Sequence, residues 1–257
     1  MSDRSEGPSG PSFASPAAAA GQRPGAGRPV TVAHRAGNDR DALERALSAG
    51  VDEVEADLRW DGGRIVNRHD RRIPLLPVYW DRWHMRIDCR PQLTLDELLE
   101  RMRGRGRPYL DLKSQSLPFL RALLETLRRH EAVDEAVISS GYWRPLDELR
   151  RGEAGLRLLR TIGDERQRAD YVALAPDDPL RAGVAIHRDL LDDELARLLR
   201  SRGVEVYVWA VDDVEEARRL VGLGATGIVA DSLELLQAAK SGPAARHKDE
   251  PMTTEMS

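Results

Sequence analysis

The chain has 257 residues, of which 41% are hydrophobic and 32% charged, which suits one large globular domain or two small ones. Its 39 basic and 43 acidic side chains nearly cancel, giving a formal net charge of −4. This balance argues against a nucleic-acid-binding protein that works by bulk phosphate neutralisation, because such domains carry a basic excess. Cys89 is the only cysteine, so no intramolecular disulfide forms and a reducing compartment is expected.

Both ends of the chain have the composition of disordered segments. Residues 1–28 contain 20 Ser, Gly, Pro and Ala residues and, like residues 241–257, have too little apolar surface to offset the entropy of ordering. No apolar run approaches the roughly 18 residues of a membrane span. The run from Ala17 to Ala20 is too short for a signal-peptide core. We therefore expect a cytoplasmic protein without a transmembrane segment, with a single domain over residues 29–240.

Between these ends, β-rich runs alternate with amphipathic helical stretches. Helices are expected, for example, at 95–102, 118–130, 192–202 and 214–224, where apolar residues recur three and four apart. Strands are expected at 29–34, 53–58, 64–69, 108–113, 136–140, 156–161, 183–187, 205–211 and 227–231. The alternation predicts parallel strands joined by right-handed crossovers.

The number of strand–helix units decides the fold class. With residues 64–69 counted as part of the loop after the second strand, about eight units remain, which predicts an α/β fold of the (β/α)8 TIM barrel type. A doubly wound open sheet is the alternative. The sequence contains neither GxGxxG nor GxxxxGK[ST] to support a nucleotide-binding version of that sheet.

Two histidines lie where strands end, which is where such barrels place their chemistry. The first strand ends at His34 and Arg35, and the loop after the second strand contains His69 and Asp70. A single histidine is weak evidence, and a surface position explains each of them equally well or better. Together, however, two imidazoles would supply both partners of acid–base chemistry.

Three carboxylates are expected at the same end of the barrel. Side chains alternate along a strand, so Glu55 and Asp57 share one face, as do Asp111 and Lys113 on the next parallel strand. Ionised acids in a confined site raise one another's pKa unless a cation lies among them. Oxygen ligands of this charge favour Mg²⁺ or Ca²⁺ over zinc. Glu53 shares the face of Glu55 but lies at the start of the strand and has no assigned role.

Lysine is rare enough in this chain to be informative. Only Lys113, Lys240 and Lys248 are lysines, and the other 36 basic residues are arginines. A solvated positive charge at position 113 would be expected as Arg. The compact ammonium of Lys113 is therefore a candidate for binding a phosphate oxygen.

Taken together, these motifs resemble the glycerophosphodiester phosphodiesterase family. Its pattern of HRG, ExD, a DG turn, HD and ExK is matched by His34–Arg35–Ala36, Glu55–Ala56–Asp57, Asp61–Gly62, His69–Asp70 and Asp111–Leu112–Lys113. Further on, VYVWAVDD and GATGIVAD resemble the family's VxVWTVN and GVDGIITD. The resemblance extends over about residues 30–236, essentially the whole expected domain.

The resemblance implies a metal-dependent hydrolase that cleaves small glycerophosphodiesters to glycerol 3-phosphate and an alcohol. It assigns metal binding to Glu55, Asp57 and Asp111, acid–base catalysis to His34 and His69, phosphate binding to Arg35 and Lys113, and contact with the glycerol moiety to Trp209. A packed barrel aromatic is an equally good interpretation of Trp209. The metal would be Mg²⁺ or Ca²⁺. The oligomeric state stays open.

The chain also departs from the family pattern. Ala36 replaces the Gly of HRG, the PENT stretch after it is missing, and Asp111 replaces the glutamate of ExK. The family's RTT after His69 is absent, and a short tryptophan-rich stretch stands there. These departures leave two alternatives open: a phospholipase D- or lysophospholipase D-like enzyme acting on lipids, and an inactive barrel that binds a phosphorylated ligand.

Overall fold

The computed structural model describes residues 28–73, 76–81, 84–175 and 183–241. The expected leader and tail therefore lie, apart from Arg28 and Ser241, outside the described residues. Over the described ranges, no helix combines the length and the apolar character needed to cross a membrane.

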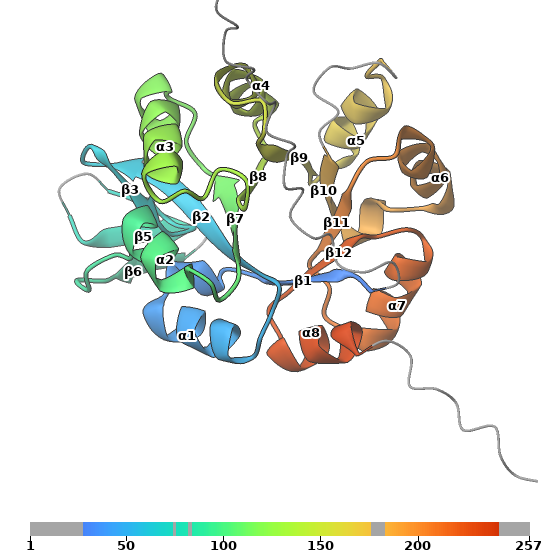
Figure 1. Ribbon diagram of the computed structural model, residues 1–257, viewed down its shortest axis with the longest axis horizontal. Coiled ribbons are helices and arrows are strands. Elements are labelled where there is room, and N and C mark those ends of the chain that lie inside the picture. The colour runs from blue at the N-terminus through green and yellow to red at the C-terminus, as the bar shows by residue number, and fades with distance from the viewer. Residues whose placement is uncertain (1–27, 74–75, 82–83, 176–182, 242–257) are drawn as a thin grey trace, which may run out of the picture.

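Eight parallel strands form a closed barrel (Figure 1). In chain order they are β1 (Val30–Ala33), β2 (Glu53–Asp61), β7 (Arg107–Leu112), β8 (Val137–Ser140), β9 (Arg157–Ile162), β10 (Gly183–His187), β11 (Val206–Trp209) and β12 (Gly227–Ala230). The sheet runs β1-β12-β11-β10-β9-β8-β7-β2, and pairing of β1 with β2 closes it. The predicted (β/α)8 barrel is confirmed, and the open sheet is excluded.

Helices surround the barrel, one after each of its strands. They are α1 (Arg40–Ser48), α2 (Leu95–Met102), α3 (Leu117–Arg129), α4 (Trp143–Gly152), α5 (Glu165–Val172), α6 (Asp193–Arg202), α7 (Val214–Gly222) and α8 (Leu233–Lys240). Short polar side chains start most of them: Thr94 caps α2 in a full capping box with Glu97, and Asp39 accepts two backbone N–H bonds at the start of α1. Their apolar faces pack on the outside of the barrel.

The inside of the barrel is a separate, smaller core. It contains Val30, Val32, Tyr109, Val137, Leu159, Ala185, Tyr207 and Val229. The rings of Tyr109 and Tyr207 stack with their centroids 5.8 Å apart. Gly227 makes room for this pair, because a Cβ there would lie 2.8 Å from the Tyr207 ring. The barrel is thus filled, and polar chemistry is left to its two ends.

The strand expected at 64–69 is present as β3 (Arg64–Asn67), which pairs antiparallel with β2. The segment after His69 contains structure that the sequence pattern did not predict: β4 (Arg71–Arg72), β5 (Val78–Asp81) and β6 (His84–Ile87) form a separate antiparallel sheet. Tyr79 on β5 is buried, with the Arg68 guanidinium 5.2 Å from its ring centroid. The three strands are two to four residues long, too short for the alternating pattern that identifies a strand in a sequence.

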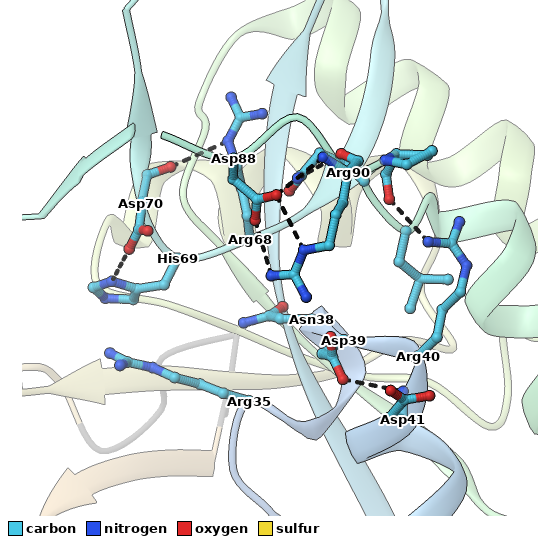
Figure 2. Close-up of a pocket in the computed structure, with 13 residues that line it drawn as sticks. Arg35, Asn38, Asp39, Arg40, Asp41, Arg68, His69, Asp70, Asp88 and Arg90 are labelled. Atoms are coloured by element: carbon cyan, nitrogen blue, oxygen red, sulfur yellow. Dashed lines mark hydrogen bonds and ion pairs between the residues drawn. The ribbon is translucent and has the colours of Figure 1, made fainter. Parts of the chain in front are cut away.

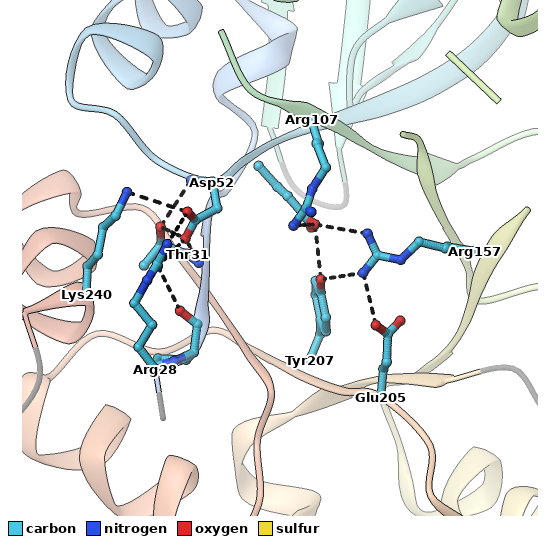
Figure 3. Close-up of polar contacts among 10 residues, drawn as sticks. Arg28, Thr31, Asp52, Arg107, Arg157, Glu205, Tyr207 and Lys240 are labelled. Carbon is cyan, nitrogen blue, oxygen red and sulfur yellow. Dashed lines mark hydrogen bonds and ion pairs between the residues drawn. The ribbon is translucent and has the colours of Figure 1, made fainter. Parts of the chain in front are cut away.

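At the amino end of the barrel, two guanidiniums and a tyrosine hydroxyl meet at one buried glutamate, and Figure 3 shows the side chains of Arg107, Arg157 and Tyr207 converging there. Glu53 is fully buried and accepts hydrogen bonds from Arg107 at 2.9 Å and from the Tyr207 hydroxyl at 3.1 Å. Arg157 lies 3.5 Å from the same oxygen and 3.1 Å from Glu205. Burial raises the pKa of Glu53, and both guanidiniums oppose that rise. The position of Glu53 low in the barrel agrees with its place at the start of the strand.

Candidate active site

The three predicted carboxylates meet at the carboxyl end of the barrel. Asp57 on β2 is in register with Asp111 on β7, and Glu55 precedes Asp57 on the same face. One carboxylate oxygen from each of the three lies within 4.8 Å of the others. Glu55 and Asp57 are buried, with 3% and 2% of their surface exposed.

Negative charge exceeds positive charge in this cluster. Burial raises the pKa of Glu55 well above its usual range, and the neighbouring Asp57 and Asp111 raise it further. Burial also works to raise the pKa of Asp57, but Lys113 and His69 together hold it below its usual value. Three oxygen donors with an unbalanced charge are the donor set that a hard divalent cation requires, so the residues present fit Mg²⁺ or Ca²⁺.

Lys113 lies among the carboxylates. Its Nζ is 3.0 Å from Asp57 and also contacts Asp111. Burial opposes ionisation of Lys113, but Asp111 and Asp57 outweigh it and raise its pKa above the usual value. The ammonium therefore stays charged, and with 24% of its side chain exposed it still reaches the barrel mouth.

His34 lies at the end of β1, where barrel closure brings it beside β12. Its Nδ1 is 2.8 Å from Oδ1 of Asp231, the residue that follows β12. A carboxylate at Nδ1 fixes the orientation of the ring and leaves Nε2 for a reacting group. No role was predicted for Asp231 from the sequence. Its position after the last barrel strand could have indicated this contact, since the first and last strands of a closed barrel are neighbours.

Arg35 and His69 lie next to each other at the mouth (Figure 2). Arg35 has a left-handed backbone with φ of 53°, and its Nε is 3.8 Å from Asp57. His69 lies close enough to Asp57 to lower its pKa, and its Nδ1 is 3.9 Å from Asp70. Arg59 donates two hydrogen bonds to the His69 carbonyl, at 3.0 and 2.6 Å, and so holds the loop. Two elements far apart in the sequence thus place both side chains at one rim.

Trp209 lies at the end of β11, two strands from β1 in the closed barrel. Its Nε1 donates to the Ala185 carbonyl at 3.2 Å, and its ring meets that of His187 edge to face, with centroids 4.7 Å apart. The side chain packs on the barrel interior but stays partly exposed. This position is compatible with both interpretations of Trp209, a packed aromatic and a substrate contact.

A cavity of about 430 Å³ opens beside Arg35 and His69 (Figure 2). Most of its lining is charged, and the basic side chains are paired: Arg68 with Asp61 at 2.9 Å and Arg90 with Asp88 at 3.0 Å. Such a surface suits a small polar group, because an alkyl chain would bury polar atoms without replacing their hydrogen bonds.

Two further residues support the carboxylates by hydrogen bonds that were not predicted from the sequence. Asn38 hydrogen-bonds Asp57, and Ser139 on β8 donates to Asp111 at 3.0 Å. Asn38 lies in the 3-10 turn Ala36–Asn38, in the part of the chain where the family's PENT stretch is missing.

Comparison with known proteins identifies the class to which this barrel and its site belong. Residues 91–235, more than half of the chain, match the model of the Glycerophosphoryl diester phosphodiesterase family. The chain belongs to this family. The matched part contains Asp111, Lys113 and Trp209, whereas both histidines, Arg35, Glu55 and Asp57 precede it.

Individual relatives are distant. Over 54 residues the chain is 37% identical to the Arabidopsis thaliana protein glycerophosphodiester phosphodiesterase GDPD4, a match that spans 21% of this chain and 16% of that relative. A Silicibacter pomeroyi structure assigned to the same activity is similar with a TM-score of 0.70 at 20% identity, covering 85% of this chain and 95% of that one. An Oleispira antarctica phosphodiesterase solved with its product sn-glycerol-3-phosphate gives 0.67 at 18% identity, with 84% and 98% covered. These structures establish the shared fold.

Proposed function

We propose that this protein hydrolyses glycerophosphodiesters to glycerol 3-phosphate and an alcohol with the help of a divalent metal. The observation that carries the proposal is the convergence of three carboxylates, Lys113 and His69 at one barrel mouth, with His34 at the end of the adjacent strand. Membership in the phosphodiesterase family supports it, as does the similarity to a phosphodiesterase solved with glycerol 3-phosphate.

Glu55, Asp57 and Asp111 would hold the metal, Mg²⁺ or Ca²⁺. Bound there, the ion supplies positive charge that stabilises the nonbridging phosphate oxygens. The charge excess of the cluster supports this assignment, because two of the three acids are buried and, among the described residues, Lys113 is the one ammonium that contacts them. Arg35 and Lys113 would bind the remaining phosphate oxygens and complete the neutralisation.

His34 and His69 would share the two proton transfers of the reaction. One takes the proton of the nucleophile, and the other protonates the departing alkoxide, each role contributing on the order of 10²–10⁴-fold. The Asp231 carboxylate 2.8 Å from Nδ1 of His34 would keep that ring oriented for either role. The nucleophile is either water or the glycerol hydroxyl of the substrate, which would form a cyclic intermediate.

The mouth offers two different surfaces, which suits a phosphodiester that carries a different group on each side of its phosphate. Trp209 presents a partly exposed aromatic surface for the glycerol moiety. The polar cavity beside Arg35 and His69 has room for the other arm.

The test is release of glycerol 3-phosphate from glycerophosphocholine by the full chain, with added Mg²⁺ or Ca²⁺ and with EDTA. We expect release that requires metal. Release that EDTA does not suppress would remove the metal assignment and leave the reaction. No release from glycerophosphocholine, glycerophosphoethanolamine or glycerophosphoglycerol would overturn the proposed activity, and a lysophospholipid assay would then separate the lipid alternative from an inactive barrel.

A further inference from the structure

Asn38 and Asp57 are joined by two hydrogen bonds in opposite directions. The Asn38 side-chain amide donates to Asp57 Oδ2 at 2.6 Å, and the Asp57 backbone N–H donates to Asn38 Oδ1 at 2.9 Å. One short side chain therefore holds both the main chain and the carboxylate of the same residue. This arrangement fixes the rotation of the Asp57 carboxylate as well as its position.

Besides the charged Lys113, the three carboxylates have donors that are neutral. Each carboxylate accepts one hydrogen bond from a neutral group: Glu55 from the Arg35 backbone N–H at 2.6 Å, Asp57 from Asn38, and Asp111 from the Ser139 hydroxyl at 3.0 Å. Neutral donors orient the oxygens without cancelling the negative charge that would attract a cation. Asn38 is the one among them that is joined to the same residue by two hydrogen bonds, one to the carboxylate and one from the backbone N–H.

The backbone shows why Asn38 reaches this place. Arg35 turns the chain through a left-handed conformation, and Gly37 then passes so close to β2 that a Cβ would lie 2.7 Å from Ala56 Cβ and 2.9 Å from the Glu55 carbonyl. The buried Asn67 side chain donates to the Gly37 carbonyl at 3.0 Å. The turn is thus pinned to the strand that carries two of the carboxylates, and Asn38 cannot drift away from Asp57.

We propose that Asn38 is a positioning residue for the metal site: it sets the orientation in which Asp57 offers its free lone pairs to the cation. The inference rests on the proposed metal-dependent function. Asn38 contacts the carboxylate and not the reacting atoms, so it acts through Asp57. Positioning partners of metal ligands are typically worth about 10–100-fold in metal affinity, and we expect Asn38→Ala to weaken binding by a factor in that range.

Mn²⁺ serves as the probe, with its binding to the full chain measured by electron paramagnetic resonance in the absence of substrate. The matched control is Asn67→Ala. This change also removes a side-chain amide that holds the turn, but it leaves both Asn38–Asp57 hydrogen bonds in place. We expect Asn38→Ala to lose affinity by the stated factor and Asn67→Ala to lose much less, although Asn67 is the more deeply buried of the two. Asn38→Ser, whose hydroxyl retains one donor, gives the same comparison if the alanine variant fails to fold.

The outcomes are distinct. Wild-type Mn²⁺ affinity in folded Asn38→Ala would overturn the role of Asn38 while leaving the metal site intact. An equal loss in Asn67→Ala would also overturn it, because turn placement alone would then explain the effect. If the wild-type chain binds no Mn²⁺, the metal assignment of the proposed function fails first, and the inference fails with it.

Discussion

Two buried glutamates lie two residues apart on β2, face the inside of the same barrel, and have opposite surroundings. Glu53, at the amino end, is met by Arg107, Arg157 and the Tyr207 hydroxyl. Glu55, at the carboxyl end, is met by two further carboxylates and by the charge of one lysine. Burial raises the pKa of both. β2 thus carries two buried acids. The charge of Glu53 is balanced by protein groups, whereas the charge of Glu55, two residues further on, is not.

Charge balance distinguishes the acid with a structural role, Glu53, from the acid with a proposed functional role, Glu55. A buried acid with two guanidinium partners is costly to remove, because the partners are then left without its counter-charge. A buried cluster with excess negative charge costs stability, and such a cost is retained in a protein when a bound cation repays it. We therefore expect changes at the amino end to reduce stability and changes at the carboxyl end to reduce activity.

The largest expected effect is on turnover. His34→Ala or His69→Ala should lower kcat by about 10²–10⁴-fold, equivalent to roughly 3–5 kcal/mol of transition-state stabilisation, because each removes a proton-transfer group. Thermal unfolding should change little, since both side chains lie partly exposed at the rim. The matched control is His130→Ala, which removes an imidazole paired with Asp96 on the outer helices. Near-normal turnover in both rim variants would contradict the acid–base assignment.

At the amino end, Glu53→Gln should act in the opposite way. The amide keeps a carbonyl for one donor but leaves Arg107 without the counter-charge of Glu53 and Arg157 with Glu205 alone, and breaking a buried pair from one side costs about 3–5 kcal/mol. We expect the lower part of that range, about 3 kcal/mol in urea unfolding, because about a quarter of the Arg107 and Arg157 side chains is exposed. kcat per folded molecule should stay within a factor of two or so.

Glu205→Gln provides the control for that variant. Glu205 pairs with the same Arg157 at 3.1 Å, but 36% of its side chain is exposed. Exposed pairs are worth about 0–1 kcal/mol, so the two variants should differ by a wide margin. Equal losses would show that burial of Glu53 is not what makes its pairing matter.

A third expected effect concerns Asp52, just before β2. Its carboxylate accepts two bonds from Arg28, at 2.8 and 2.9 Å, and further bonds from the Thr31 N–H and hydroxyl at 2.9 and 2.8 Å (Figure 3). Burial works to raise the pKa of Asp52, but these donors and Lys240 lower it below the usual value. Asp52→Asn should cost about 2 kcal/mol at pH 7, the worth of hydrogen bonds to a charged group.

The pH dependence of that cost has a definite sign. Because the folded-state pKa of Asp52 is depressed, its contribution is complete above the unfolded-state pKa of about 3.9 and is lost as the pH falls through the folded-state value. Urea unfolding at pH 7, 5 and 3.5 should therefore show a constant gap between wild type and Asp52→Asn at the two higher values and a smaller gap at the lowest. A gap that widens on acidification would contradict the ion-pair explanation.

Sequence patterns predicted those parts of the molecule that repeat. The eight barrel strands all lie within the expected runs or differ from them by a few residues, since each alternates with a helix. The side-chain alternation on β2 and β7 also placed Glu55, Asp57 and Asp111 on one face of two neighbouring strands. Their roles as metal ligands stay predictions, as do the roles of both histidines.

Pairs between distant segments could not be predicted in the same way. The partner of Glu53 at position 157 is more than a hundred residues away, and no local pattern marks it. Asn38 reaches Asp57 only because a left-handed Arg35 and a close approach of Gly37 bend the chain there, and neither follows from residue type. The strands of the small sheet after His69 are too short to show a period.

The smallest expected effect is on the melting temperature of Glu55→Gln, and it distinguishes most sharply between the two glutamates. Because the folded-state pKa of Glu55 is raised, its ionisation costs stability once the pH exceeds the unfolded-state value of about 4.3. In EDTA, Glu55→Gln should therefore unfold at a higher temperature than wild type at pH 8, by roughly 2–4 °C for about 1 kcal/mol, and this gain should shrink towards pH 5 and vanish below about pH 4. The same change at Glu53 should lower the melting temperature, because Glu53, although burial raises its pKa as well, carries the counter-charge of Arg107 and Arg157.

Added Mg²⁺ or Ca²⁺ should reverse the order at the mouth. A cation that binds only the folded state stabilises wild type by RT ln(1 + [L]/Kd), and Glu55→Gln loses one of the three oxygen donors and part of the attracting charge. Glu53→Gln should keep the full metal-induced rise, because Glu53 is not among the three carboxylates that converge at the mouth. If metal stabilised Glu55→Gln as much as wild type, the unbalanced charge of Glu55 would need another explanation. The direction in which each substitution shifts the melting temperature, and the reversal of that shift by metal, therefore distinguish an acid that stabilises the barrel from one that is positioned to bind a cation.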